Sequence, residues 1–178
     1  PSVTIVNGDQ TYTAQYVVPI YNDLLVYTLN SDEISYSVKL QSGTTPISIK
    51  IPSTYLGMPV TSIGERAFSY CTSLTSIEIP NSVTTIGDYA FYNCSSLTSI
   101  NVNDDNTNYS SIDGVLYNKN KTTLIDYPCA KLENGFVIPN SVTTISAGAF
   151  SHCTFLTSIV IPNSVTTIGD YTFSYCTS

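Results

Sequence analysis

One ten-residue segment occurs twice in this chain, letter for letter, and constrains its fold more than any other feature. Residues 79–88 and 161–170 both read IPNSVTTIGD, and residues 138–145 carry the first eight letters. Phenylalanines and cysteines recur at an interval of 23 residues, as in the pairs Phe68 and Phe91 or Cys153 and Cys176. A fixed period of this length is typical of a repeat architecture, in which each unit packs against its neighbours.

The repeats divide most of the chain into five units. We place them at residues 46–73, 74–96, 97–132, 133–155 and 156–178. Unit 97–132 carries 13 extra residues, and unit 46–73 carries five, residues 55–59, in its first turn. Residues 1–45 do not repeat.

A regular unit such as 74–96 predicts a strand, a turn and a short helical return. Ile77 and Ile79 alternate with polar residues, which indicates a short strand. Pro80 lacks an N–H group and therefore ends the strand. Residues 87–91 are typical of a single α-helical or 3₁₀ turn. The position of Gly87 holds Ser146 in another unit, so we expect a helix N-cap there rather than a glycine with positive φ.

These residues resemble the BspA-type leucine-rich repeat, whose pattern is L-x-x-I-x-I-P-x-x-V-x-x-I-G-x-x-A-F-x-x-C-x-x. The resemblance covers residues 46–178, and about four units fit at nearly every apolar position. Unit 97–132 departs from the pattern, because Asn103 replaces the proline and the A-F pair and the cysteine are lost. Hairpin variants of this kind also occur in that family. The expected fold is a leucine-rich-repeat solenoid of short parallel strands with short helical or 3₁₀ returns.

Two segments outside the regular pattern predict antiparallel structure. In unit 97–132, apolar runs flank residues 118–121 and predict a β-hairpin. Residues 1–45 show alternating stretches at 3–6, 12–18, 24–29 and 34–40, separated by turn residues. We expect a small antiparallel β cap that covers the first repeat, because the end of a solenoid core must be shielded.

The charge balance excludes several classes of function. Six Lys and Arg stand against 13 Asp and Glu, for a net charge of -7. So few cations make nucleic acid or an anionic membrane surface poor partners. No apolar run approaches the roughly 18 residues of a membrane span. Polarity comes instead from hydroxyls, since 24 Ser and 24 Thr are present.

The cysteines are expected to be structural. Cys71, Cys94, Cys153 and Cys176 share one repeat position next to the phenylalanine, which predicts small buried thiols. Cys129 stands outside this column and is a candidate for an exposed position. No C-x-x-C pair is present, so a structural zinc site is not expected. We expect no cofactor.

No catalytic set is expected either. His152 is the only histidine, and its equivalents are Tyr70, Asn93 and Tyr175, so we interpret it as a variable surface position. Asp104, Asn106 and Asn108 fit the opening of a calcium loop. The glycine and the closing glutamate of such a loop are missing, and an ordinary polar turn is favoured.

The candidate binding surface is the outward row of the predicted strands. Its side chains diverge between units while the flanking apolar positions barely change. The row comprises Lys50, Thr75, Ser76, Glu78, Thr98, Ser99, Asn101, Val137, Thr157, Ser158 and Val160, with Ile47, Ser48, Asn134 and Gly135 beside them. An alternative is that its hydroxyls only keep an exposed β surface soluble.

The family resemblance implies a non-enzymatic binding scaffold. We expect a segment of a secreted or cell-surface protein that takes part in adhesion or host interaction and binds a protein or a glycan. The alternative is a non-catalytic module of a larger surface enzyme, one that recognises carbohydrate. Unit 156–178 ends at the last position of the repeat, so we expect the chain to belong to a longer array. In isolation we expect either edge-to-edge self-association or disorder at this end. Phe91 and Phe150 should be fully buried.

Overall fold

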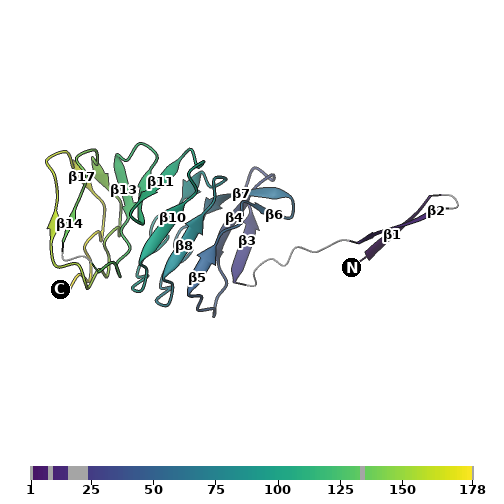
Figure 1. Cartoon of the computed structure of the whole chain (residues 1–178), viewed down its shortest axis with the longest axis horizontal. Coiled ribbons are helices and arrows are strands. Elements are labelled where there is room, and N and C mark those ends of the chain that lie inside the picture. The colour runs from purple at the N-terminus through teal and green to yellow at the C-terminus, as the bar shows by residue number, and fades with distance from the viewer. Residues whose placement is uncertain (1, 8–9, 16–23, 133–134, 178) are drawn as a thin grey trace.

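The computed structural model describes residues 2–7, 10–15, 24–132 and 135–177, with side chains for 24–132 and 135–177. Within these residues the chain forms seventeen short strands and no helix. It winds into successive coils that stack side by side along the long axis of Figure 1. The expected leucine-rich-repeat solenoid of parallel strands is confirmed, although its returns are turns rather than helices.

One row of parallel strands follows the L-x-x-I-x-I segments, and we call its outward side the strand face. Strands β5 (Ser48–Lys50), β8 (Ser76–Ile79) and β10 (Ser99–Val102) form one sheet, visible side by side in Figure 1. Strands β14 (Phe136–Val137) and β16 (Ile159–Val160) form a second, two-stranded sheet. Both sheets are parallel and in register, so equivalent residues of successive coils lie next to each other.

A second row of strands follows the V-x-x-I segments. Its N-terminal part joins β4 (Tyr36–Leu40), β7 (Met58–Ile63) and β9 (Thr85–Ile86) in parallel. Its C-terminal part joins β13 (Thr123–Asp126), β15 (Thr144–Ile145) and β17 (Thr167–Ile168), also in parallel. The repeated threonines of this row tie the coils together. The Thr84, Thr143 and Thr166 hydroxyls donate to the carbonyls of Thr61, Thr122 and Thr143 on the preceding coil.

The apolar repeat positions form the core between these rows. Leu74, Ile77, Ile79 and Val83 are all buried, as the alternation in unit 74–96 requires. Phe91 and Phe150 are buried too, which confirms the prediction. The Phe68 and Phe91 rings stack with their centroids 5.9 Å apart, and those of Phe150 and Phe173 stack at 5.4 Å. Stacked copies therefore bury side chains that one unit alone would expose.

The expected helical returns are wrong, and hydrogen bonding between coils gives the reason. In the first coil, Arg66, Phe68 and Tyr70 donate their N–H groups to the carbonyls of Asp88, Ala90 and Tyr92 on the next coil. These donors are therefore lost to any helix. Two residues of each return also have positive φ, which a helix excludes. They are Arg66, Tyr70, Tyr89, Asn93, Gly148, His152, Tyr171 and Tyr175.

Close stacking of the coils, and not helix capping, explains Gly87 and Gly169, which open two of the returns; at Gly64 the nearest atom to a Cβ would be Ser37 Oγ at 3.5 Å. Gly87 does not have positive φ, but a Cβ there would lie 2.5 Å from the backbone nitrogen of Glu65. At Gly169 the same atom would lie 2.4 Å from the nitrogen of Ala147. Ser146 occupies this position in the unit that follows the irregular one. The N-cap interpretation is therefore wrong, while the expectation of ordinary φ is right.

The irregular unit 97–132 contains three antiparallel strands. They are β11 (Tyr109–Ile112), β12 (Val115–Asn118) and β13, and the hairpin predicted around residues 118–121 is confirmed as β12–β13. Side chains of β12 alternate between two hydrophobic cores. Leu116 packs in an N-terminal core that reaches from Leu25 to this strand. Val115 and Tyr117 pack in a C-terminal core that reaches to Leu156.

The same unit supplies an aromatic residue and a cysteine that the repeat pattern seemed to lack. Tyr127 donates its N–H to the carbonyl of Ala149, as Phe68 does to Ala90, and its ring stacks on Phe150 with centroids 5.1 Å apart. Cys129 is buried and forms a disulfide with Cys153. The expectation of an exposed Cys129 and of a free thiol at Cys153 is therefore wrong. Cys71 and Cys94 are buried free thiols, and Cys176 is half-buried.

The segment before the repeats contains two hairpins. Strands β1 (Ser2–Asn7) and β2 (Gln10–Gln15) pair with each other, and β3 (Leu25–Leu29) pairs with β4. Strand β4 continues the second row through β7, so β3 and β4 shield the first coil; the predicted strand residues 16–18 lie outside the described residues. The five extra residues of unit 46–73 form a hairpin between β6 (Thr54–Tyr55) and β7, turning at Leu56 and Gly57.

An aromatic row on the returns corrects the interpretation of His152. Its ring stacks on Tyr175 with centroids 4.6 Å apart, and Tyr92 meets its other side edge-on at 5.1 Å. Tyr70 contacts Tyr92 in turn at 5.7 Å. His152 is half-buried, and burial lowers its pKa. His152 is therefore a packing residue that links coils on either side of the irregular unit, whereas its equivalents Tyr70 and Tyr175 are 60 % and 65 % exposed.

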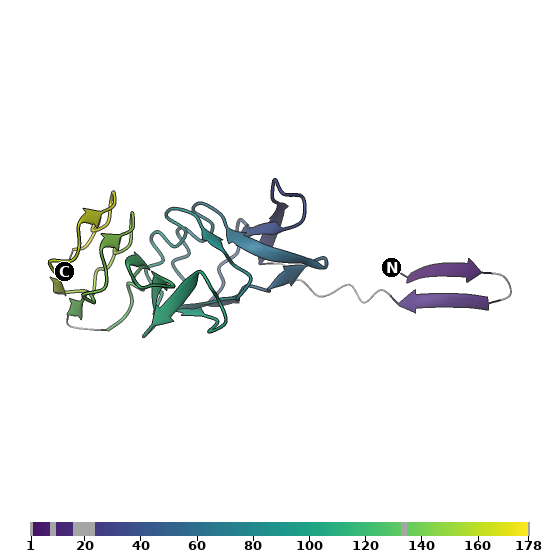
Figure 2. The same ribbon diagram turned by 90° about the horizontal axis from the view of Figure 1, so that it is seen from above.

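The last described coil is more open than the others. The side chain of Phe173 is 37 % exposed, whereas that of its equivalent Phe150 is 0 % exposed. Ile168 is exposed, whereas its equivalent Ile145 is buried. Figure 2 shows this coil at the end of the stack, with one neighbour among the described coils.

Candidate functional site

Parallel register brings three of the predicted binding residues into one line. Lys50 pairs with Glu78, and Glu78 pairs with Asn101, on adjacent strands β5, β8 and β10. The residues that precede them, Ile49, Ile77 and Ile100, point the other way and are buried. A period of two therefore places the variable side chains in solvent and the invariant ones in the core. We call Lys50, Glu78 and Asn101 the polar row.

The polar row contains an exposed ion pair. Lys50 Nζ lies 2.8 Å from Glu78 Oε2, and their side chains are 80 % and 56 % exposed. The hydrogen bond to Glu78, followed by its charge, raises the pKa of Lys50. An exposed pair of this kind contributes little to stability. Instead, it places a positive group on β5 and a negative group on β8, and a partner can meet each of them with an opposite charge.

A pocket of about 510 Å³ opens beside the polar row, where the strands end in turns. Lys50, Glu78 and Asn101 line one side of it. Its remaining wall comes from the residues that end the strands and start the turns: Ile51, Pro52, Ser53, Thr54, Ile79, Pro80, Asn81, Val102 and Asn103. Amides, hydroxyls and one ion pair around a shallow pocket can form hydrogen bonds to a polar partner.

The threonines of the predicted surface already have partners in the fold. Thr75 donates its hydroxyl to the carbonyl of Ile47 at 2.9 Å, and Thr98 donates to Thr75 at 2.8 Å. Asn101 donates to the Ser99 hydroxyl at 3.3 Å. Thr75 and Thr98 therefore hold adjacent coils together, which leaves Lys50, Glu78 and Asn101 as the most available groups. Ser76 is half-buried between Ser48 and Ser99 in the register.

The C-terminal part of the strand face is aliphatic. Val137 pairs with Val160 in register, and their side chains are 67 % and 56 % exposed. Thr157 and Ser158 are exposed beside them, and a Cβ on Gly135 would lie 2.5 Å from Ser158 Oγ. Asn134 lies outside the described residues. These two valines belong to a different sheet from the polar row, so the predicted residues form two patches and not one.

The calcium-loop candidate is a structural turn. Asn106 is fully buried, and its side-chain amide donates to the carbonyls of Pro80 and Val83. Its Oδ1 accepts from the N–H groups of Asn108 and Tyr109. This side chain therefore has no lone pair directed at solvent. Across the described residues, no group of three or more His, Cys, Asp or Glu is placed to hold a metal.

Sequence reasoning missed the pocket wall formed by Ser53, Asn81 and Asn103. Ser53 and Asn81 follow the strand-ending prolines Pro52 and Pro80, and Asn103 stands at the proline position itself. The signal was present, because polar residues after parallel strands gather at one edge of a sheet. No helix of the described part has the length and hydropathy of a membrane span.

Comparisons with known proteins identify the repeat. The family described as BspA type Leucine rich repeat region matches residues 42–178 in six copies. A search among curated proteins finds no match. Three solved structures are similar. Pneumococcal vaccine antigen PcpA has 25 % identity and a TM-score of 0.61 over 72 % of this chain and 37 % of its own.

The other two are leucine-rich repeat proteins. TpLRR of T. pallidum has 28 % identity and a TM-score of 0.53, over 86 % of this chain and 65 % of its own. A protein of Bacteroides ovatus has 26 % identity and a TM-score of 0.55, over 89 % and 45 %. The chain thus spans between 37 % and 65 % of the length of these three proteins.

Proposed function

Because the chain belongs to the BspA-type leucine-rich-repeat family, we propose that it is a non-enzymatic binding scaffold of a cell-surface or secreted protein. Its role is adhesion or host interaction, and its partner is a protein or a glycan. Binding takes place on the strand face, at the polar row and its pocket, with the valine patch of Val137 and Val160 as a second contact.

The observation that carries this proposal is the divergence of the polar row on an otherwise copied framework. Lys50, Glu78 and Asn101 occupy one repeat position on adjacent strands and differ in charge and shape. Their buried neighbours Ile49, Ile77 and Ile100 are identical. A row selected only for solubility would not need a fixed ion pair beside a pocket of about 510 Å³.

Two further observations support an extracellular location. The Cys129–Cys153 disulfide joins adjacent coils, and disulfides persist mainly in oxidising compartments. The likeness to PcpA, a pneumococcal vaccine antigen, favours the same location. The exposed valines Val137 and Val160 favour a protein partner, since exposed apolar surface is a feature of protein–protein contacts.

The test reverses the polarity of the row without changing net charge. The double variant Lys50→Glu with Glu78→Lys is compared with the wild type for binding to a panel of extracellular-matrix proteins and to a glycan array. We expect at least a tenfold loss of affinity for the partner, because the charges that it meets exchange places. The thermal midpoint should stay unchanged, since the pair is exposed.

A matched control exchanges two exposed charges that do not belong to the strand face, Glu33→Lys in the β3–β4 turn with Lys121→Glu in the β12–β13 turn. This variant should bind like the wild type. Unchanged binding by the strand-face variant, with loss in the control, would place the site on the hairpin loops and contradict the proposal. Binding only to the glycan array would favour the carbohydrate-recognising module.

A further inference from the structure

The cysteine column of the solenoid contains a second pair of neighbouring sulfur atoms besides the Cys129–Cys153 disulfide. Cys71 and Cys94 occupy the same repeat position on two adjacent coils. Both are buried, and both are free thiols. The chain therefore places two reduced cysteines on neighbouring coils in the same way that it places two bonded ones further along the stack.

Backbone hydrogen bonding holds these two coils together close to the sulfur atoms. The N–H of Tyr70, one residue before Cys71, donates to the carbonyl of Tyr92, two residues before Cys94, at 2.8 Å. Segments paired in this way run about 5 Å apart, and disulfides join Cα atoms that are about 4.4–6.8 Å apart. The two thiols are also in direct hydrogen-bonding contact. A bond between Cys71 and Cys94 is therefore within reach of the fold.

Cys94 also has the orientation of a cysteine that already forms a disulfide. Its Sγ lies 3.1 Å from the carbonyl oxygen of Phe68 on the preceding coil. Cys153 Sγ lies 4.0 Å from the equivalent carbonyl oxygen, that of Tyr127. In both cases the sulfur is directed at the preceding coil, which carries the neighbouring cysteine. Joining Cys94 to Cys71 therefore requires rotation of side chains but no change in how the coils stack.

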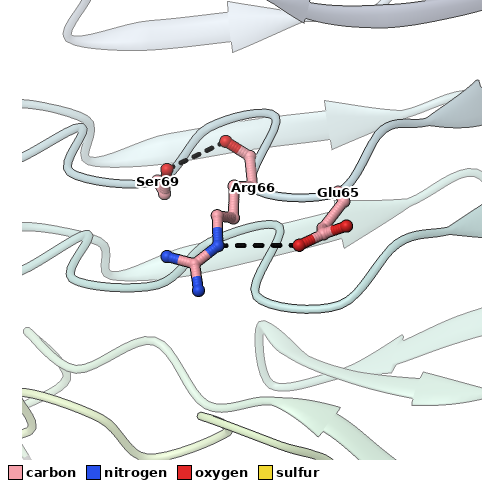
Figure 3. A network of polar contacts seen from close by, with 3 residues as sticks. All are labelled: Glu65, Arg66 and Ser69. Carbon is pink, nitrogen blue, oxygen red and sulfur yellow. Dashed lines mark hydrogen bonds and ion pairs between the residues drawn. The ribbon is translucent and has the colours of Figure 1, made fainter.

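A pocket leads small molecules to Cys71. It has a volume of about 420 Å³ and lies between the loop after β4 and the first return turn, and Cys71 is part of its wall, whereas Cys94 is not. Figure 3 shows this turn, in which the Ser69 hydroxyl donates to the carbonyl of Arg66 at 2.9 Å and the Arg66 side chain reaches toward Glu65. These contacts fix the turn two residues before Cys71.

The shared hydrogen bond makes the two thiols chemically unequal. The hydrogen bond from Cys94 outweighs burial and lowers the pKa of Cys71. The contact with Cys71, followed by burial, raises the pKa of Cys94. Because the thiolate, and not the thiol, attacks a disulfide, Cys71 is suited to attack first and Cys94 to follow. The more acidic thiol is also the one at the pocket wall.

We propose that Cys71 and Cys94 are a redox-active pair that reacts with a low-molecular-weight disulfide and closes into a second bond between coils. Cys71 loses its proton to solvent, and its thiolate attacks one sulfur of the small disulfide, which forms a mixed disulfide and releases one thiolate. That thiolate takes up the proton of Cys94, whose sulfur then attacks Cys71 Sγ and releases the second thiolate, which solvent protonates. The two cysteines are oxidised, and the small disulfide is reduced to two thiols.

The product fastens the two coils that carry β5 and β8. These strands hold the Lys50–Glu78 ion pair of the polar row. A disulfide restricts the unfolded chain and stabilises the fold. The oxidised chain should therefore have a thermal midpoint at least about 4 °C above that of the chain before reaction.

Peptide mapping after reaction of the full chain with hydroxyethyl disulfide tests the pair. Trypsin releases residues 67–119 as one peptide, because no Lys or Arg lies between Arg66 and Lys119. We expect this peptide to be lighter by two hydrogen atoms and to resist alkylation until it is reduced. The Cys129–Cys153 bond should persist and should link residues 122–131 to 132–178.

Single variants test the two roles. Cys94→Ser should stop after the first step and retain one mercaptoethanol group on Cys71. Cys71→Ser should leave Cys94 unmodified, because Cys94 does not line the pocket. The matched control Cys176→Ser removes the third free thiol and should form the Cys71–Cys94 bond as the wild type does. The wild-type map needs no variant, so it decides the matter even if a variant fails to fold.

Three results would overturn this proposal. Recovery of residues 67–119 with both thiols alkylated, after Cys176 has reacted, would show that the pair is inert. Faster modification of Cys94 in Cys71→Ser than of Cys71 in Cys94→Ser would contradict the assigned roles. A Cys153–Cys176 bond in place of Cys71–Cys94 would move the chemistry to the last coil. No partner binding is measured, so the outcome is independent of the strand-face proposal.

Discussion

Gly87, which opens one of the return turns, gives the sharpest test of how the coils stack. A Cβ at Gly87 would meet three backbone atoms of the preceding coil, Glu65 N at 2.5 Å, Glu65 Cα at 2.8 Å and Gly64 C at 2.8 Å. Backbone atoms cannot rotate away as side chains do, so the Gly87→Ala variant has to separate two coils. Strain of this kind costs about 1–3 kcal/mol.

The unfolded state offsets part of this cost. Alanine reduces the freedom of the unfolded chain and contributes about 0.4–1 kcal/mol of stability. The φ of Gly87 is not positive, so no additional backbone strain arises. We therefore expect Gly87→Ala to lower the free energy of unfolding by about 1–2 kcal/mol. For a chain of this size that is a fall in the thermal midpoint of about 2–8 °C.

Thermal and urea unfolding, followed by circular dichroism, measure the effect. Ser146→Ala is the matched control, because Ser146 occupies the equivalent position and already carries a Cβ; its change should stay within about 0.5 kcal/mol. If Gly87→Ala is as stable as the wild type, or if Ser146→Ala is equally damaging, then close coil contact does not explain the glycine.

Three further predictions concern the core, the aromatic row and the buried turn. Phe150→Ala should cost about 3–5 kcal/mol, whereas Phe173→Ala at the equivalent, 37 % exposed position should cost less than half as much; equal costs in urea unfolding would refute the stacking account. Burial lowers the pKa of His152, so the folded state favours its neutral imidazole. The stability that this side chain contributes to the fold is complete above the unfolded-state pKa of about 6.5 and is lost as the pH falls below it. The wild type should therefore lose more thermal stability between pH 7 and pH 5 than His152→Asn, and parallel curves would show that the ring does not matter. Asn106→Ala leaves the carbonyls of Pro80 and Val83 without their side-chain donor and should cost at least about 2 kcal/mol, against almost nothing for the exposed Asn108→Ala.

The strands and the core of this protein are predictable because they depend on local pattern. Alternation places Ile77 and Ile79 on a strand, and Pro80 ends it wherever the unit lies in the chain. The hairpin at residues 118–121 follows from two apolar runs and a polar turn. Each of these features is decided within a few residues, so sequence alone suffices.

The return turns are not predictable in this way, because the neighbouring coil decides their structure. Glycine, aspartate and tyrosine at 87–89 are compatible with a helical turn. The helix is excluded by the positive φ of Tyr89 and Asn93, and because the carbonyls of this return accept N–H groups from the preceding coil. The Cys129–Cys153 disulfide is not predictable from the sequence for a related reason. Cys129 follows Tyr127 by two residues instead of three, so it falls out of the repeat spacing while occupying the same place in space.

The candidate site is also predictable only in part. The exposed row of Lys50, Glu78 and Asn101 follows from period-two alternation. The pocket beside it depends on how three successive turns approach one another. The occupied hydroxyls of Thr75 and Thr98 depend on contact with the preceding coil. Sequence therefore indicates which side chains face outward, but not which of them remain available to a partner.

The most direct test of the central proposal is the affinity of a triple variant, Lys50→Ser, Glu78→Ser and Asn101→Ser, for the partner that binds the wild type most tightly in the matrix and glycan panel. Serine keeps the exposed β surface polar and already occurs beside each position in the row. We predict at least a tenfold loss of affinity, measured by surface plasmon resonance, with a thermal midpoint within about 2 °C of the wild type. Wild-type affinity in this variant would contradict the strand face as the binding surface.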